Sequence, residues 1–193
     1  MSEPYIIAEI GSNWRIAGKG DITNLAAIDM TIRQAKACGA DAVKFQMFTH
    51  EDLYGFPGDD KFSLPRRYIP VIAEKCKKLG IDFMCTAFSA DGVKFVNKFV
   101  DMHKIASSSI GNPMLVEAVE SSGKPFLVSN GMFGIPWDME DECFPMLCAS
   151  AYPAEIHDYD FYFIGDQVCL GETWGLSDHT KTNDLAILCR IHG

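Results

Sequence analysis

The 193-residue sequence has little positive charge: 17 Lys and Arg stand against 26 Asp and Glu, which gives a formal net charge of −9. Nucleic acids and anionic membranes both bind basic surfaces, so we expect neither as a partner. No apolar run reaches the roughly 20 residues that a membrane helix needs. The start at Met1 lacks the basic region and apolar core of a signal peptide, which favours a cytoplasmic location.

Several motifs of known chemistry are also missing. None of the seven cysteines stands in a Cys-x-x-Cys pair, and most lie in apolar runs, which indicates buried, reduced thiols rather than a disulfide framework or a zinc ribbon. There is no Gly-rich phosphate loop, no Gly-x-Ser-x-Gly nucleophile motif, and no Cys/His pair arranged as a nucleophile and its base.

What the sequence does contain is a regular alternation of strand-like and helix-like segments as far as Gly131. Short apolar runs predict strands, and the segments between them carry apolar residues at helical spacing. Strands are expected at 5–11, 42–48, 81–88, 102–108 and 125–131, and helices at 22–39, 64–80, 91–99 and 112–123. This alternation is typical of a parallel α/β domain, and the continuous apolar strands indicate that both sheet faces are covered.

The pattern weakens after Gly131. Residues 133–143 and 157–173 show little periodicity, and the remaining expected elements are strands at 146–152 and 174–177 and a helix at 184–191. We therefore expect about seven strands within a single domain over residues 1–193.

Polar residues stand at the C-terminal end of almost every expected strand. In a (β/α)8 barrel these ends meet at one mouth, where barrel enzymes carry their chemistry, whereas in a doubly wound sheet they spread along an edge. Seven polar strand ends favour a TIM-type barrel, although 193 residues is short against the roughly 250 that are typical of that fold.

Lys44 and Lys104 each interrupt an apolar strand. An unpaired buried ammonium group is costly, so each lysine should face the mouth or a partner. With Thr86, Ser107 and Ser177 they would form a site for a phosphate and a carboxylate. The alternative is that each lysine extends to a strand end or pairs with Glu9, which could itself orient a substrate.

His179 follows the last expected strand and lies beside Asp178. It could be a metal ligand or a general base, although an isolated histidine next to an aspartate more often has a structural role. His103 should point away from the mouth, because side chains alternate along a strand and Lys104 faces inward.

Taken together, the motifs resemble the N-acetylneuraminate (sialic acid) synthase family. They occur in the family's order, at residues 7–13 (IAEIGSN), 41–46 (DAVKFQ), 85–89 (CTAFS), 104–107 (KIAS), 123–125 (GKP), 131–132 (GM), 150–153 (SAYP) and 175–180 (GLSDHT). The resemblance implies a (β/α)8 barrel that condenses phosphoenolpyruvate with N-acetylmannosamine or a related 2-acetamido sugar. It also implies a divalent ion, Mn2+ or Mg2+, that polarises the sugar aldehyde.

The resemblance assigns roles to ten residues. Phosphoenolpyruvate would be held by Lys44, Thr86, Lys104, Ser107 and Ser177. Of these, the two lysines would also be catalytic, as would Glu9. The remaining candidates would be Glu9 near the sugar or metal, Gln46 and Tyr152 at the sugar, Ser150 in place of an Asn or Ser, and His179 as metal ligand.

The chain also departs from the family pattern. Trp14 replaces a usual His, Ser109 replaces a Glu expected to touch the sugar, and the segments after Met132 and Tyr152 are short for helices five and six. The family's eighth strand and antifreeze-like domain are not found. We therefore expect an incomplete or truncated barrel that forms a homo-oligomer. Two alternatives stay open: a non-catalytic relative that binds phosphoenolpyruvate or sugar or serves as an assembly subunit, and an aldolase with a Schiff-base lysine.

Overall fold

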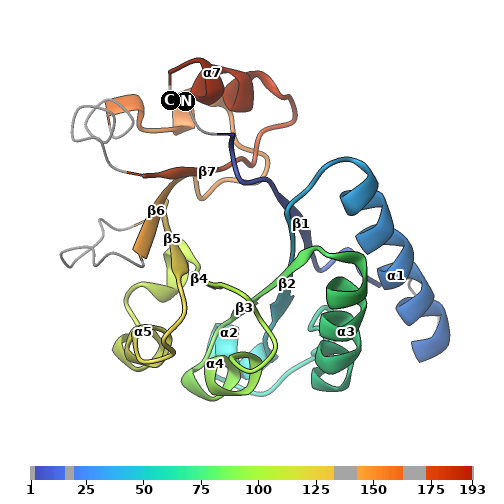
Figure 1. Cartoon of the computed structure of the whole chain (residues 1–193). Coiled ribbons are helices and arrows are strands. Elements are labelled where there is room, and N and C mark those ends of the chain that lie inside the picture. Colours follow the sequence, from blue (N-terminus) through green and yellow to red (C-terminus); the bar gives the residue numbers. More distant parts are fainter. Residues whose placement is uncertain (1–2, 16–19, 133–142, 163–172, 193) are drawn as a thin grey trace.

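The computed structural model describes residues 3–15, 20–132, 143–162 and 173–192 (Figure 1). Its strands are β1 (Ile7–Gly11), β2 (Ala42–Met47), β3 (Asp82–Ala87), β4 (His103–Ile105), β5 (Phe126–Asn130), β6 (Cys143–Cys148) and β7 (Gly175–Ser177). Its helices are α1 (Asp21–Ala37), α2 (His50–Tyr54), α3 (Ile69–Leu79), α4 (Ala90–Val96), α5 (Pro113–Glu120) and α7 (Asp184–His192). Short 3-10 turns are η1 (Arg66–Tyr68), η2 (Ser107–Ser109) and η3 (Ile156–Asp158).

All strand pairs are parallel, and strand order follows chain order. One sheet runs β1-β2-β3 and the other β4-β5-β6-β7, and a parallel bridge between Met84 and Met102 connects them. Figure 1 shows the strands around a common centre with α1, α3, α4 and α5 outside. This confirms the predicted α/β fold of TIM-barrel type. No ladder joins β7 to β1 within the described ranges.

Some predicted boundaries were wrong. The strand expected at 146–152 is β6 at Cys143–Cys148, so Ser150 and Tyr152 lie beyond the sheet on the rim. The strand expected at 102–108 ends at Ile105, because the chain turns there into η2, in which the Ser109 amide donates to the Ala106 carbonyl at 2.8 Å. The unpredicted helix α2 has no apolar stripe and depends instead on a capping box at its N-terminus. The segments read as shortened helices five and six lie largely outside the described residues.

The barrel interior has an apolar layer below a polar one. Ala42, Met84, Leu127 and Met146 form a buried cluster, against which Met102 packs. Because side chains alternate along a strand, the residue two positions after each of these faces the interior one layer higher. That residue is polar on four of these strands, namely Lys44, Thr86, Ser129 and Lys104, and is the thiol of Cys148 on the fifth.

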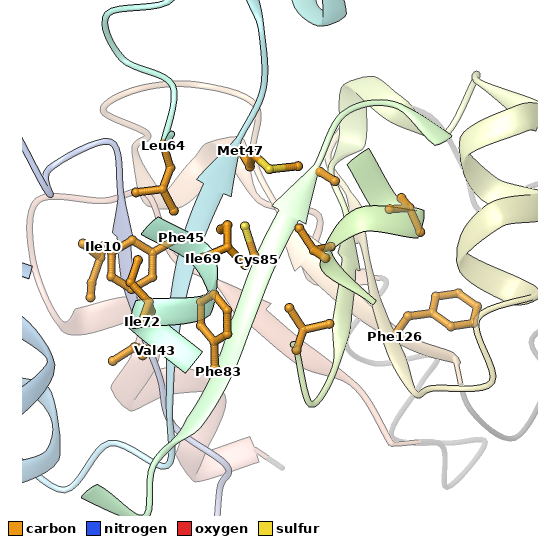
Figure 2. Packing of buried hydrophobic residues seen from close by; sticks show 14 of the residues in the cluster. Ile10, Val43, Phe45, Met47, Leu64, Ile69, Ile72, Phe83, Cys85 and Phe126 are labelled. Atoms are coloured by element: carbon orange, nitrogen blue, oxygen red, sulfur yellow. The ribbon is translucent and has the colours of Figure 1, made fainter. Parts of the chain in front are cut away.

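The outward faces of the same strands pack against the helices. Phe45 and Phe83 are fully buried, with ring centroids 6.1 Å apart in an edge-to-face contact. Figure 2 shows these rings beside Ile69 and Ile72 of α3. Helix α3 ends at Gly80, whose φ of 62° is left-handed backbone that favours glycine. The strands are thus covered on both faces, as their continuous apolar sequence predicted.

A second, smaller core lies under the C-terminal part of the chain. It consists of Leu147, Ala149, Ala154, Tyr159 and Leu185, and is separate from the main cluster between sheet and helices. The six cysteines in the described part of the chain are free thiols. No helix that the structure describes is long and apolar enough to cross a membrane.

His103 points away from the barrel interior, as strand alternation predicted. Its Nε2 donates to Asn97 Oδ1 at 3.0 Å, and the side chain is buried. Burial, and secondarily the nearby Lys124 ammonium, lower the pKa of His103 to about 4.

Protonation of His103 should therefore destabilise the fold. The unfolded state takes up the proton near pH 6.5 and the folded state only near pH 4, so stability is complete above pH 6.5 and falls as the pH drops through this window. Between pH 6.5 and 5 we expect a loss of about 2 kcal/mol in the free energy of unfolding. Urea unfolding at pH 6.5 and at pH 5 measures this loss. In His103→Gln the free energy of unfolding should change much less between the two pH values. An equal loss in the variant would assign it to other groups.

Candidate active site

Lys44 lies on β2, directly across the ladder from Glu9 on β1. Its ammonium forms an ion pair with the Glu9 carboxylate and lies 3.5 Å from the Thr86 hydroxyl of β3. Lys44 is 5% exposed, whereas the Glu9 side chain is half exposed. The pairing considered as an alternative from sequence is therefore present, and it leaves the ammonium at the boundary between interior and mouth.

Lys104 occupies the equivalent place on β4. Its Nζ lies 3.5 Å from Ser177 Oγ at the end of β7. Burial, followed by the positive charge of Lys44, lowers the pKa of Lys104 to about 8, against opposing contributions from Glu9 and Cys148. Two ammonium groups thus share a poorly solvated space, and an anion placed between them would relieve both desolvation and repulsion.

Three serines and a glycine lie at or just beyond the C-terminal ends of β4, β5 and β6. The Ser107 hydroxyl donates to Ser129 O at 3.1 Å and accepts from Gly131 N at 3.0 Å. A Cβ on Gly131 would come within 2.8 Å of Ser150 Oγ and 2.9 Å of Ser107 Oγ, so only glycine allows both hydroxyls this close. The Ser129 hydroxyl is buried without a hydrogen-bond partner among the described residues. A buried unpartnered hydroxyl is costly, so it marks a position where a ligand would gain a hydrogen bond.

His179 has one ring nitrogen engaged and one directed at the site. Nδ1 lies 2.6 Å from the Ala149 carbonyl, which only accepts, so Nδ1 carries the proton. Nε2 lies 3.4 Å from Ser177 Oγ. This tautomer leaves the Nε2 lone pair available, which is the arrangement of metal-ligating histidines held by a backbone carbonyl. The Tyr152 ring stacks on the imidazole at a centroid distance of 4.2 Å.

Cys148 belongs to the site although sequence reasoning left it in the core. Its Sγ lies 3.9 Å from His179 Nδ1. Burial raises the pKa of the Cys148 thiol, but His179, Lys104 and Ser107 outweigh burial and hold the pKa below its ordinary value. Cys148 sits in an apolar run, so only the inward register of β6 reveals that it faces the mouth. Ser129 is one of the polar strand-end residues expected at the mouth from the sequence.

Comparison with known proteins agrees with this geometry. The model of the NeuB family matches residues 31–193. The chain belongs to the NeuB family. The resemblance to sialic acid synthases drawn from the motifs is thereby confirmed.

Two relatives and one solved structure illustrate the likeness of this NeuB-family chain. An uncharacterized protein of Methanocaldococcus jannaschii is 31% identical over 91% of this chain and 55% of its own length. The pseudaminic acid synthase of Helicobacter pylori is 26% identical over 99% of this chain and 62% of its own length. The chain thus spans somewhat more than half the length of these relatives. The crystal structure of a sialic acid synthetase from Leptospira borgpetersenii has a TM-score of 0.81 at 24% identity, covering 98% of this chain and 70% of that one, which supports the barrel fold.

Most residues matched to NeuB-family motifs gather at this mouth. An ion pair and a hydroxyl contact connect Glu9, Lys44 and Thr86. Hydroxyl and ring contacts connect a second set, which consists of Lys104, Ser177, His179 and Tyr152. Gln46 joins them near Glu9, since a Cβ built on Gly11 would lie 3.3 Å from Glu9 Oε1 and 3.6 Å from Gln46 Nε2. Ser107 and Ser150 line the mouth at Gly131.

The departures from the NeuB-family pattern have structural counterparts. Trp14 is buried in the outer core against Tyr68, with ring centroids 5.7 Å apart, so it does not replace the usual His with another mouth-facing ligand. Ser109 is buried within η2 and supplies a hydroxyl where a carboxylate was expected. Over the described part of the chain, no three His, Cys, Asp or Glu side chains are grouped as a metal site, so His179 stands as a single candidate ligand.

Proposed function

We propose that this NeuB-family barrel condenses phosphoenolpyruvate with a 2-acetamido sugar of the N-acetylmannosamine type, giving a sialic-type nonulosonic acid and phosphate. The observation that carries the proposal is a pair of ammonium groups beside hydroxyls at one mouth, from the buried Lys44 and the partly buried Lys104. Phosphoenolpyruvate carries a phosphate and a carboxylate, and this set offers charge and hydrogen bonds to both.

Each group has a place in this chemistry. Lys44 and Lys104 would neutralise the phosphate and carboxylate, with hydrogen bonds from Thr86, Ser107 and Ser177. The unpartnered Ser129 hydroxyl would add one more donor. The enol carbon attacks the sugar aldehyde, water adds at the carbon that bears phosphate, and phosphate leaves by carbon–oxygen cleavage. Because the Glu9 carboxylate is half exposed beside Lys44, it can orient that ammonium and still reach the sugar.

The sugar would lie above the anion site. Gln46, Ser150 and Tyr152 stand one level higher at the rim, where their polar groups can reach sugar hydroxyls. The Tyr152 ring is 78% exposed, so it offers a flat face at the entrance. The relatives named above differ in their sugar products, so the identity of the acyl-amino sugar is left to the assay.

The described residues at the mouth offer a divalent ion one candidate protein ligand, His179. His179 would contribute Nε2, because Nδ1–H is fixed on the Ala149 carbonyl. When bound, Mn2+ or Mg2+ would polarise the sugar aldehyde as a Lewis acid. One protein ligand alone would hold the ion weakly. We also infer that the enzyme is cytoplasmic. We infer further that self-association supplies the remaining metal ligands and closes the barrel.

A second candidate function is a non-catalytic relative that binds phosphoenolpyruvate without turnover. The observation that favours it is Ser109, which stands where the family resemblance implies a glutamate, so the carboxylate expected to contact the sugar is missing. The two functions differ in whether phosphate release requires the sugar.

The test is phosphate release from phosphoenolpyruvate in the presence of Mn2+, with and without N-acetylmannosamine. We expect release that depends on the sugar and that falls at least about 100-fold in His179→Ala, because the aldehyde would lose its Lewis acid. The matched control is His157→Ala, an exposed histidine on η3, which should leave the rate unchanged. Binding of phosphoenolpyruvate without any release would favour the non-catalytic relative. Trapping of a carbonyl substrate on Lys44 or Lys104 by borohydride would instead favour the Schiff-base aldolase.

A further inference from the structure

We propose that Tyr159 is a positioning residue for the mouth: its hydroxyl fixes the segment that carries Ser177 and His179. The inference rests on the proposed function, since it concerns how the metal-ligating imidazole is aimed. Tyr159 lies just after η3, in a stretch whose sequence shows no periodicity and no family motif.

The hydroxyl makes two hydrogen bonds to the same short segment. It accepts from the backbone N–H of His179 at 2.7 Å and donates to the carbonyl of Ser177 at 3.4 Å. A phenol can donate once and accept at the same time, so both bonds are chemically compatible. They hold the backbone on either side of Asp178, whose own carboxylate points to the Thr180 amide.

Neighbouring residues hold the same segment from the same side. The backbone N–H of Ala154 donates to the carbonyl of His179 at 2.9 Å. The Tyr152 ring lies on the imidazole, and Ala149 O receives its Nδ1–H. The His179 amide, carbonyl and ring are therefore each fixed by a different partner, and together these determine where Nε2 points.

The position of Tyr159 is itself well determined. It is 4% exposed in the small C-terminal core, packed with Leu147, Ala154 and Leu185. Burying the ring would stabilise this core whatever the hydroxyl did. The hydroxyl, however, is aimed at the backbone next to two candidate site residues, and loss of its acceptor would leave the His179 amide without that bond. The ring and the hydroxyl thus have separable roles.

Tyr159→Phe removes only the hydroxyl, and Tyr68→Phe is a matched control. Tyr68 is 2% exposed, and its hydroxyl donates to Asp21 at 2.7 Å, at the start of α1 and away from the mouth. Two quantities are measured on the full chain: the hydrogen-exchange rate of the His179 amide by NMR, and the dissociation constant of Mn2+ alone. We expect Tyr159→Phe to raise both at least about tenfold, as when an outer-shell partner of a metal ligand is lost, and Tyr68→Phe to change neither.

His179→Ala in the same Mn2+ titration separates the possible failures. If it abolishes Mn2+ binding while Tyr159→Phe leaves the Mn2+ affinity unchanged, Tyr159 is only structural and the inference is wrong. If amide exchange is unchanged in Tyr159→Phe, the hydroxyl does not hold the segment, and the inference is also wrong. If His179→Ala binds Mn2+ as the wild type does, or the wild type binds none, the proposed metal site fails. The proposal that Tyr159 positions a metal-ligating imidazole is then also wrong, even if the His179 amide exchanges faster in Tyr159→Phe.

Discussion

Replacing either Lys44 or Lys104 by methionine will weaken phosphoenolpyruvate binding roughly 100-fold, which corresponds to loss of a charge-assisted hydrogen bond of about 3 kcal/mol. Methionine keeps the apolar stem, so the interior layer stays filled while the ammonium is lost. Isothermal titration with phosphoenolpyruvate alone, without sugar or metal, measures the effect.

The control is Lys78→Met on α3, whose ammonium pairs with exposed Glu74. It should bind phosphoenolpyruvate as the wild type does. Thermal unfolding of all three variants checks that they fold. If both interior lysine variants bound with wild-type affinity, the anion would have to sit elsewhere and the proposed function would lose its main support.

Phosphoenolpyruvate binding should also depend on pH through Lys104. Its pKa of about 8 in the free protein means that the ammonium is largely protonated at pH 7 and largely neutral at pH 9. An anion binds the protonated form, so affinity should be level below pH 8 and fall up to about tenfold per pH unit above it. The second pKa of a phosphate monoester is about 6, so the ligand is almost fully ionised from pH 7 upward and contributes little to the dependence.

Isothermal titration with phosphoenolpyruvate at pH 7, 8.5 and 9.5 measures this dependence. Repeating it in buffers of different ionisation enthalpy gives the number of protons taken up on binding. At pH 8.5 we expect net proton uptake on binding. Lys104→Arg keeps its charge across the range, so whatever affinity it retains should be independent of pH. A flat profile without proton uptake in the wild type would contradict either the lowered pKa of Lys104 or its contact with the anion, and the affinity of Lys104→Met separates the two.

The sequence was most informative where burial imposes a pattern. Parallel strands covered on both faces must be continuous apolar runs, so the order of strands and helices could be predicted. Lys44 and Lys104 stood out because a charge inside such a run needs a physical explanation.

Residues that look ordinary in their local sequence were missed. Cys148 is small and lies among apolar neighbours, and only the inward register of β6 brings it to the mouth. Tyr159 follows a segment without periodicity, and its contacts are with residues about 20 positions away. Helix α2 depends on side-chain caps rather than on an apolar stripe, so hydrophobic spacing gave no sign of it.

The two separate cores divide the mouth into two mechanical halves. Lys44 and Thr86 stand on strands anchored in the large cluster, whereas His179 and its neighbours depend on the five-residue cluster beneath them. Cooperative units of unequal size open at different free energies, and a small one opens first. Under the proposed function, Lys44 and Thr86 would keep their places while the segment with Ser177 and His179 opens locally, so the mouth would lose its Ser177 hydroxyl and its imidazole before it loses the Lys44 ammonium.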